Sequence, residues 1–242
     1  MCEKSFFLPS FFFFLFKSFI LMLKQTKNEM TEGTVTEESE FDIDLVTELF
    51  EKSLFGDNDV SLPLYIDAYR QINKFFSLLN KGFSFVEKDL LEKEKILHEL
   101  HVADPAHYDT VNSMVSWECR LGAPFEKGSR TLLRLHRALL FIVDFLKNLK
   151  DSREEDQISM LCQASYDGTL SKYHSWIVRK LVGVAAHLLA SRDCMLNAII
   201  SGRSSRHEYE VMQAITRFIS IAEQVFYRLQ KIYEDKNILN LP

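Results

Sequence analysis

The sequence predicts an all-α fold, and three observations support this prediction. Apolar residues recur every three or four positions over most of the chain, as they do along the buried face of a helix. Gly and Pro, which interrupt helices, number only 8 and 5 among 242 residues. No stretch alternates apolar and polar residues in the manner of a half-buried strand. A hydrophobic content of 47% with 26% charged residues is typical of a globular domain.

The expected elements follow one another with short connections. The turn GDND separates the first two helices, and Pro63 lies at the start of the second, where proline is favoured. Gly122 and Pro124 end a later helix. We expect about eight helices in one domain, over residues 41–54, 64–79, 83–100, 108–121, 129–149, 158–164 followed by 170–190, 192–200 and 207–235.

The first 29 residues differ from the rest because they are rich in Phe and Leu. A signal peptide has such a basic start and apolar centre, but no small-residue cleavage site follows here. A membrane anchor is longer than this run, which Lys17 interrupts. We therefore expect residues 1–29 to be an apolar extension outside the fold or the product of an upstream start, and residues 30–242 to form the domain.

Charge and motifs exclude several classes of function. The formal net charge of −5 disfavours nucleic acid as a partner. The four cysteines are far apart and make no zinc or redox pair, so we expect no metal and no cofactor. The nucleophile elbow, the phosphate-binding loop and the zinc-protease motif are all missing from the sequence, so we do not expect an enzyme.

The segment RTLLRLHRALLF carries cations on an otherwise apolar helix. At helical spacing Arg130, Arg134 and Arg137 fall on one stripe, which Phe141 and Phe145 continue. The remaining circumference is apolar, so we expect this helix to be largely buried. A buried guanidinium group cannot lose its charge and needs an anion. Either acidic side chains or a ligand could supply that anion.

Three other clusters carry polar residues of interest. Asp89 and Lys93 share a helix face, which fits an exposed ion pair as well as a binding site. His174 lies among aromatic residues, where most histidines are satisfied core residues. Trp176 in the run WIVRK has the composition of a surface that touches a membrane interface, or of a helix with one partly buried Trp. Composition and spacing leave these alternatives open.

In their order and spacing, these motifs resemble the glycolipid transfer protein superfamily. Asp89-x-x-x-Lys93, the Arg130–Arg137 run and Tyr173-His174-x-Trp176 carry the resemblance, which extends from about Phe41 to the terminal Leu-Pro. RTLLRLHRAL, SKYHSWIVRK and ILNLP are most similar to members that carry ceramide-1-phosphate. The resemblance implies a two-layer helical sandwich around a hydrophobic lipid pocket, and non-enzymatic transfer of a phosphorylated sphingolipid between membranes.

The resemblance also implies roles for individual residues. Asp89 would accept hydrogen bonds from the ceramide amide N–H and a hydroxyl, and His174 would donate to the amide carbonyl. Lys93, Arg130 and Arg134 would surround the lipid phosphate. Sugar-binding members carry an aromatic residue at the place of Arg134 and Asn at that of Lys93. Arg137 could equally be a structural partner.

The remaining expectations concern the membrane and the pocket. Trp176, Ile177 and Lys180 would dock on a membrane. The resemblance implies a monomer in the cytoplasm that contacts membranes transiently, such as the Golgi or the inner leaflet of the plasma membrane. By apolar type and position, the candidates for lining the pocket are Phe41, Ile43, Phe50, Phe85 and Leu139.

Three alternative functions remain at this point. The chain could carry or sense neutral glycosphingolipids, although Arg134 disfavours a sugar head group. It could be a helical interaction module that binds an acidic peptide with its arginine stripe. It could also be a lipid-modifying hydrolase with His174 and Asp89 as its base, although no nucleophile or metal cluster accompanies them.

Overall fold

The computed structural model describes residues 41–78, 83–122, 126–200 and 207–242. All of them belong to the compact unit Glu40–Pro242. The prediction for residues 1–29 therefore lies outside the described residues. Within the described ranges the fold is all-α, as predicted, apart from a two-stranded hairpin.

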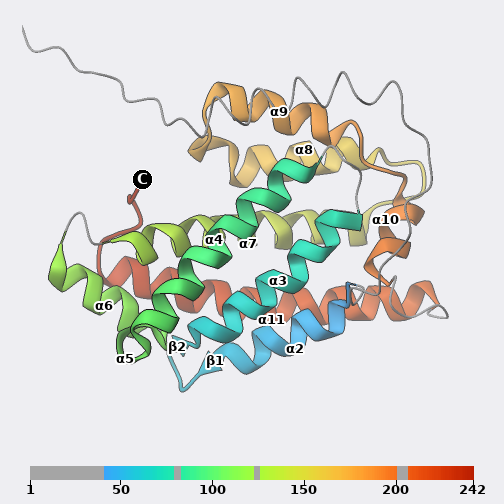
Figure 1. The fold of residues 1–242 in the computed structure, drawn as a ribbon. Coiled ribbons are helices and arrows are strands. Elements are labelled where there is room, and N and C mark those ends of the chain that lie inside the picture. Colours follow the sequence, from blue (N-terminus) through green and yellow to red (C-terminus); the bar gives the residue numbers. More distant parts are fainter. Residues whose placement is uncertain (1–40, 79–82, 123–125, 201–206) are drawn as a thin grey trace, which may run out of the picture. The chain divides into compact units, whose positions relative to one another are not determined.

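Ten α-helices and one 3-10 turn make up the described part of the chain (Figure 1). The helices are α2 (Ile43–Ser53), α3 (Leu62–Leu78), α4 (Ser84–Ala103), α5 (Pro105–Tyr108), α6 (Val111–Leu121), α7 (Lys127–Asp151), α8 (Ile158–Thr169), α9 (Trp176–Ala186), α10 (Arg192–Ile199) and α11 (Glu208–Asp235). The 3-10 turn η2 spans Ser171–Tyr173. The strands β1 (Leu54–Phe55) and β2 (Asp59–Val60) pair antiparallel.

Five helices pack in a closed ring around the core. α2 packs on α3, α3 on α4, α4 on α7, α7 on α11, and α11 again on α2. In Figure 1 α2, α3 and α4 form a layer in front of α7 and α11. Outside the ring, α8 packs against α7, and α9 packs against α8. α7 is therefore the helix that links the ring to the α8–α9 pair.

Two expected helices have different bounds in the structure. The expected helix 170–190 is interrupted after η2 by the extended backbone of His174, and α9 follows as Trp176–Ala186. Ser175 caps α9 because its side chain accepts a hydrogen bond from Val178 N–H. The expected helix 108–121 begins three residues later, as α6 after its Thr110 cap, and the short helix α5 precedes it. The GDND turn is present as the loop of the β1–β2 hairpin, which the sequence did not predict.

The core face of α7 is buried along its length. Leu132, Leu139, Val143 and Leu146 are at most 8% exposed and pack with α11 and α4. His136 lies on the same face, with Nε2 2.8 Å from Gln230 Oε1 and its ring stacked on Phe226. None of the helices in the described ranges has the length and apolar character needed to cross a membrane.

Candidate functional site

The arginine stripe of α7 lies at the surface of the fold. Arg134 is exposed, and Arg130 and Arg137 are half-buried. The expectation that these guanidinium groups are buried was therefore wrong. The stripe runs along one side of α7, and the opposite side of the helix faces the core. The arginines are accessible to an anion that approaches from solvent.

Carbonyl groups of the C-terminal segment face this stripe. The Nη2 atom of Arg134 donates to Pro242 O at 3.3 Å. Arg137 Nη2 donates to Leu239 O at 2.8 Å and to Leu241 O at 3.3 Å. The Leu239 and Leu241 oxygens are neutral peptide carbonyls, and a guanidinium group binds an anionic oxygen more strongly than a neutral one. The C-terminal segment therefore occupies an N–H donor of Arg134 that could instead bind an anion.

Arg137 is engaged on a second side by an aromatic ring. Its guanidinium carbon lies 4.0 Å from the centre of the Tyr173 ring, within the range of a cation–π contact. Tyr173 directly precedes His174. Arg137 therefore ties the His174 turn to α7 and to the C-terminal segment, which supports a structural role for this arginine.

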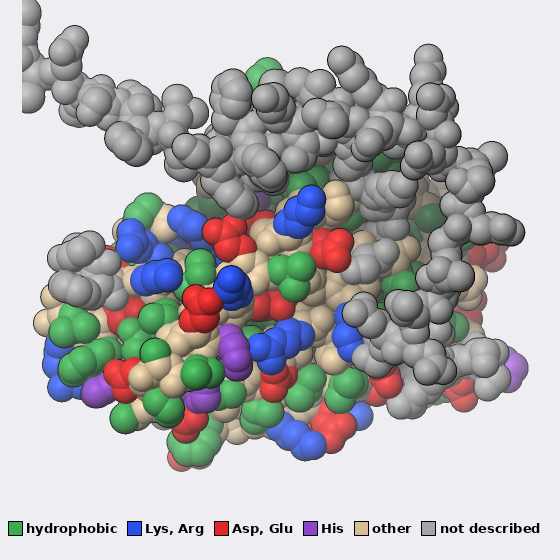
Figure 2. All heavy atoms as spheres, in the orientation of Figure 1, with side chains coloured by type: hydrophobic (Ala, Val, Ile, Leu, Met, Phe, Trp, Pro, Cys, Tyr) green, Lys and Arg blue, Asp and Glu red, His purple; other side chains and the backbone are tan. Residues whose placement is uncertain are grey.

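Asp89 and Lys93 form the pair that their spacing indicated. Lys93 Nζ contacts Asp89 Oδ1 and lies 3.4 Å from the Asp89 carbonyl oxygen. The Lys93 side chain is only 12% exposed, whereas that of Asp89 is 51% exposed. The carboxylate is therefore open to further donors. On the face in view, Figure 2 shows acidic and basic side chains interspersed over α3 and α4.

His174 lies close to this pair. Burial lowers the pKa of His174, the Asp89 carboxylate raises it, and the Lys93 ammonium group lowers it further. The imidazole is half-buried and its Nδ1 lies 2.8 Å from the hydroxyl oxygen of Tyr166. The structure thus brings together Asp89, Lys93 and His174, which are far apart in the sequence.

The hydroxyl of Tyr166 is the hydrogen-bond partner of Nδ1 in this histidine. Burial raises the pKa of Tyr166 to about 12, so its hydroxyl keeps its proton at neutral pH. If the hydroxyl donates to Nδ1, the ring hydrogen of neutral His174 resides on Nε2, which can then donate to a carbonyl. Tyr166 was not predicted as a site residue, since no spacing rule relates two residues across the end of α8.

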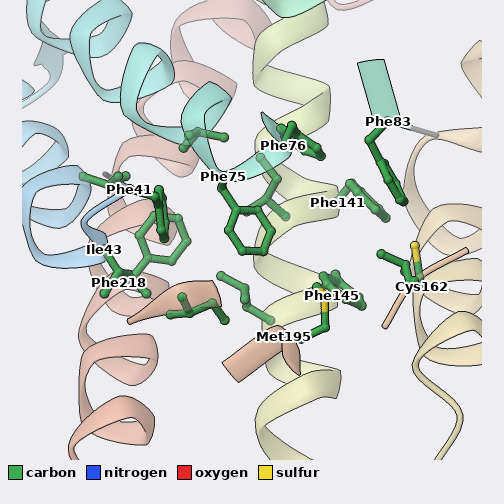
Figure 3. Close-up of a pocket in the computed structure, with 16 residues that line it drawn as sticks. Phe41, Ile43, Phe75, Phe76, Phe83, Phe141, Phe145, Cys162, Met195 and Phe218 are labelled. Carbon is green, nitrogen blue, oxygen red and sulfur yellow. The ribbon is translucent and has the colours of Figure 1, made fainter. Parts of the chain in front are cut away.

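An apolar cavity adjoins these polar groups. It has a volume of about 70 Å³, and only apolar side chains and one thiol line it, mainly from α2, α3, α7, α8, α10 and α11 (Figure 3). Phe141 and Phe145 of the α7 stripe are among them. The ring of Phe141 contacts the edge of Tyr166, at 6.4 Å between centroids. Phe141 therefore links the lining of the cavity to Tyr166, the partner of His174.

The predicted lining residues have different positions. Phe41 and Ile43 line the cavity. Phe50 and Leu139 are completely buried in the core and are not among the lining residues. Phe85 is half-buried and does not line it either. Phe50 packs instead against Tyr65, Tyr69 and Phe218, since the buried face of α2 is wider than the part that meets the cavity.

The predicted docking residues begin α9. Trp176 is 65% exposed, and Lys180 Nζ lies 5.9 Å from the centre of its ring. Ile177 is half-buried. Val184 and Leu188, further along this segment, are also exposed apolar residues. Elsewhere, no group of three potential metal ligands occurs among the residues that the structure describes.

The chain is similar to known proteins in sequence. The family model "Glycolipid transfer protein (GLTP)" matches residues 60–201. The ceramide-1-phosphate transfer protein of Rattus norvegicus is 36% identical over 217 residues, which cover 85% of this chain and 98% of the relative. The protein of that name from Danio rerio is 31% identical over 211 residues, covering 84% and 98%.

Solved structures of similar proteins have the same fold. The apo-form of mouse ceramide-1-phosphate transfer protein superposes with a TM-score of 0.78 at 33% identity, covering 84% of this chain and 100% of that one. The human protein in complex with 12:0 ceramide-1-phosphate superposes with a TM-score of 0.76 at 31% identity, with the same coverage. The chain therefore belongs to the glycolipid transfer protein family, a family of lipid-transfer proteins rather than enzymes.

Proposed function

We propose that this protein moves ceramide-1-phosphate between membranes and leaves the lipid chemically unchanged. One observation carries the proposal: a single stripe of α7 runs from Arg130 and Arg134 to Phe141 and Phe145, which line the apolar cavity. A lipid with an anionic head and apolar chains matches this order. The relatives named above, which carry or bind ceramide-1-phosphate, support the same ligand.

The phosphate would bind to Lys93, Arg130 and Arg134. Guanidinium groups bind phosphate oxygens with forked N–H pairs, and the ammonium group of lysine adds a point charge. Arg134 would exchange the Pro242 oxygen for a phosphate oxygen. Lys93 would keep its contact with Asp89 and direct its remaining N–H groups to the phosphate.

The ceramide amide would bind between Asp89 and His174. Asp89 has carboxylate lone pairs to spare for the amide N–H and a hydroxyl. His174 would donate through Nε2 to the amide carbonyl, with Tyr166 holding Nδ1. An acceptor and a donor on either side of one amide select sphingolipids, because glycerolipids lack this group.

The apolar chains would enter the cavity by widening it. Its volume of about 70 Å³ is roughly half that of a cavity of about 150 Å³ that binds benzene. An acyl chain is larger, so lining side chains must separate as it enters. Each buried CH₂ contributes about 0.8 kcal/mol relative to water, which offsets what the chain loses on leaving the bilayer.

Docking would use the start of α9. Trp176 and Ile177 would enter the interface, and Lys180 would contact lipid head groups. One interfacial Trp with a few cations makes a weak contact, so the protein can leave again. We extend the proposal to a monomer that works on cytoplasmic leaflets, such as those of the Golgi and the plasma membrane.

Vesicle transfer tests the proposal directly. The 242-residue chain would be mixed with donor and acceptor vesicles that contain fluorescent ceramide-1-phosphate, glucosylated ceramide or phosphatidic acid. Transfer of ceramide-1-phosphate alone is the expected result. Transfer of glucosylated ceramide at an equal rate would contradict the phosphate assignment, and transfer of phosphatidic acid at an equal rate would contradict the amide assignment.

A further inference from the structure

The first turn of α7 has no cap from its own sequence. Glu126 precedes the helix, and its side chain makes no capping hydrogen bond. The first backbone N–H groups of a helix have no partner within the helix, so they need one from elsewhere. In this protein Glu118 of α6 supplies it. Glu118 accepts from Gly128 N–H at 2.8 Å with Oε1 and from Ser129 N–H at 2.7 Å with Oε2.

Glu118 is held in place by further contacts. It is completely buried, and its Oε1 also accepts from the hydroxyl of Tyr108 at 3.0 Å. Gly128 allows the carboxylate to come this close, because a Cβ atom there would lie 2.8 Å from Glu118 Oε1 and 2.8 Å from Met114 Sδ. A carboxylate at a helix N-terminus is also favoured by the helix dipole.

The opposite side of the same turn is tied to α11. The Tyr233 hydroxyl, completely buried, donates to Ser129 O at 2.8 Å. Arg130 follows Ser129 directly, and Arg134 lies one turn further on. The helices α6 and α11 thus fix the turn from which the cationic stripe starts, whereas its guanidinium groups lie closer to the surface.

We propose that Glu118 is a positioning residue for phosphate recognition. It touches no ligand, but it sets the register and direction of the first turn of α7, and with them the points from which Arg130 and Arg134 reach the phosphate. Gly128 serves the same role by admitting the carboxylate. This inference rests on the proposed function, since it concerns the same phosphate.

Two variants of the 242-residue chain test this role. Glu118→Gln keeps the shape but points an N–H₂ group at a backbone N–H, and Gly128→Ala pushes the carboxylate away. We expect the ceramide-1-phosphate content of donor vesicles that gives half-maximal transfer to rise about tenfold, roughly the effect of one weakened charge-assisted bond. The maximal rate should stay unchanged. Gly128→Ala keeps the test valid if Glu118→Gln does not fold.

A control separates positioning from general loss of stability. Val225 is a completely buried core residue of α11, and Val225→Ala should lower the melting temperature without changing half-saturation. If the two variants behave like Val225→Ala at a similar melting temperature, Glu118 has only a structural role and the proposal fails.

A second readout does not depend on lipid transfer. The Nε–H NMR signals of Arg130 and Arg134, assigned from single Arg→Lys variants, should shift in Glu118→Gln and Gly128→Ala but not in Val225→Ala. Unshifted signals would overturn the positioning role. If the wild type carries no ceramide-1-phosphate while the signals do shift, the proposed function fails and the positioning of the arginines stands.

Discussion

The α7 stripe has a polar half, formed by its arginines, and an apolar half, formed by Phe141 and Phe145. The two halves differ in how much they must rearrange to bind a ligand. Arg134 already donates a hydrogen bond to an oxygen of Pro242, which a phosphate oxygen would replace under the proposed function. Phe141 and Phe145 line a cavity of about 70 Å³, which a lipid chain must widen. Under the proposed function, the polar half is therefore preformed and would set specificity, whereas the apolar half would supply binding energy only after it has rearranged.

The largest expected effect comes from the apolar half. Phe145 is 8% exposed, and Phe145→Ala should lower the free energy of unfolding by about 3–5 kcal/mol, the usual cost of removing a buried Phe. Urea unfolding measures it. Phe55 is 58% exposed, so Phe55→Ala should change stability by less than about 0.5 kcal/mol. Equal losses for both variants would contradict the packing described for the stripe.

The opposite face of α7 gives a pH-dependent prediction. Burial lowers the pKa of His136 to about 4, from an ordinary 6.5. The unfolded chain binds this proton as the pH falls below about 6.5, so His136 lowers stability between pH 6.5 and 4 by about 3 kcal/mol.

Glu94 acts in the opposite direction. Burial raises its pKa to about 7, from an ordinary 4.5, so the folded state binds this proton first and stability rises as the pH falls from 7 to 4.5. The two buried groups offset each other in the wild type. His136→Phe should therefore become more stable on acidification over this range, as followed by urea unfolding at each pH. A flat profile for His136→Phe would contradict the assignment to these two groups.

A smaller effect is expected in the polar half. Arg134→Leu should slow ceramide-1-phosphate transfer by roughly tenfold to a hundredfold, the equivalent of losing about 1.5–3 kcal/mol of hydrogen bonding to a charged group. Unfolding should be unchanged because the side chain is exposed. Arg217, exposed and paired with Glu51 at 2.7 Å, provides a control in Arg217→Leu. If both variants transfer lipid at the wild-type rate, Arg134 has no part in binding.

The smallest expected effect is at the junction of the two halves. Tyr166→Phe removes the hydroxyl that holds His174 Nδ1, and we expect a loss of about 1 kcal/mol, or roughly fivefold, in sphingolipid transfer. Tyr227, which is 65% exposed, serves as the matched control in Tyr227→Phe. The effect should be equal for phosphorylated and glycosylated ceramides, if both are carried, because the amide is common to them.

Local sequence predicted the long helices but not every break. Apolar periodicity was sufficient for α7 and α11, which present a continuous buried face. It failed between residues 170 and 190, because the break depends on Ser175 capping α9 and on the extended backbone of His174. The β1–β2 hairpin was not predicted, because each of its strands has only two residues and so shows no alternating pattern.

The candidate site was predictable only where it followed spacing within one helix. The Asp89–Lys93 pair is of this kind. The exposure of the arginine stripe was not predictable, because it depends on which side of α7 its neighbours cover, and the tail that meets it lies about a hundred residues away in the chain. Glu118 and Tyr166 were missed for the same reason, since each acts on a residue of another element.

The small cavity has a consequence for a carrier that must travel in both directions. An open apolar cavity costs about 24 cal/mol per Å³, so one of several hundred Å³ would cost on the order of 10 kcal/mol, as much as the whole stability of a typical domain. A lining that closes to about 70 Å³ reduces that cost to about 2 kcal/mol. After it releases its lipid, the protein can therefore return without losing most of its folding stability and without exposing an apolar interior to solvent.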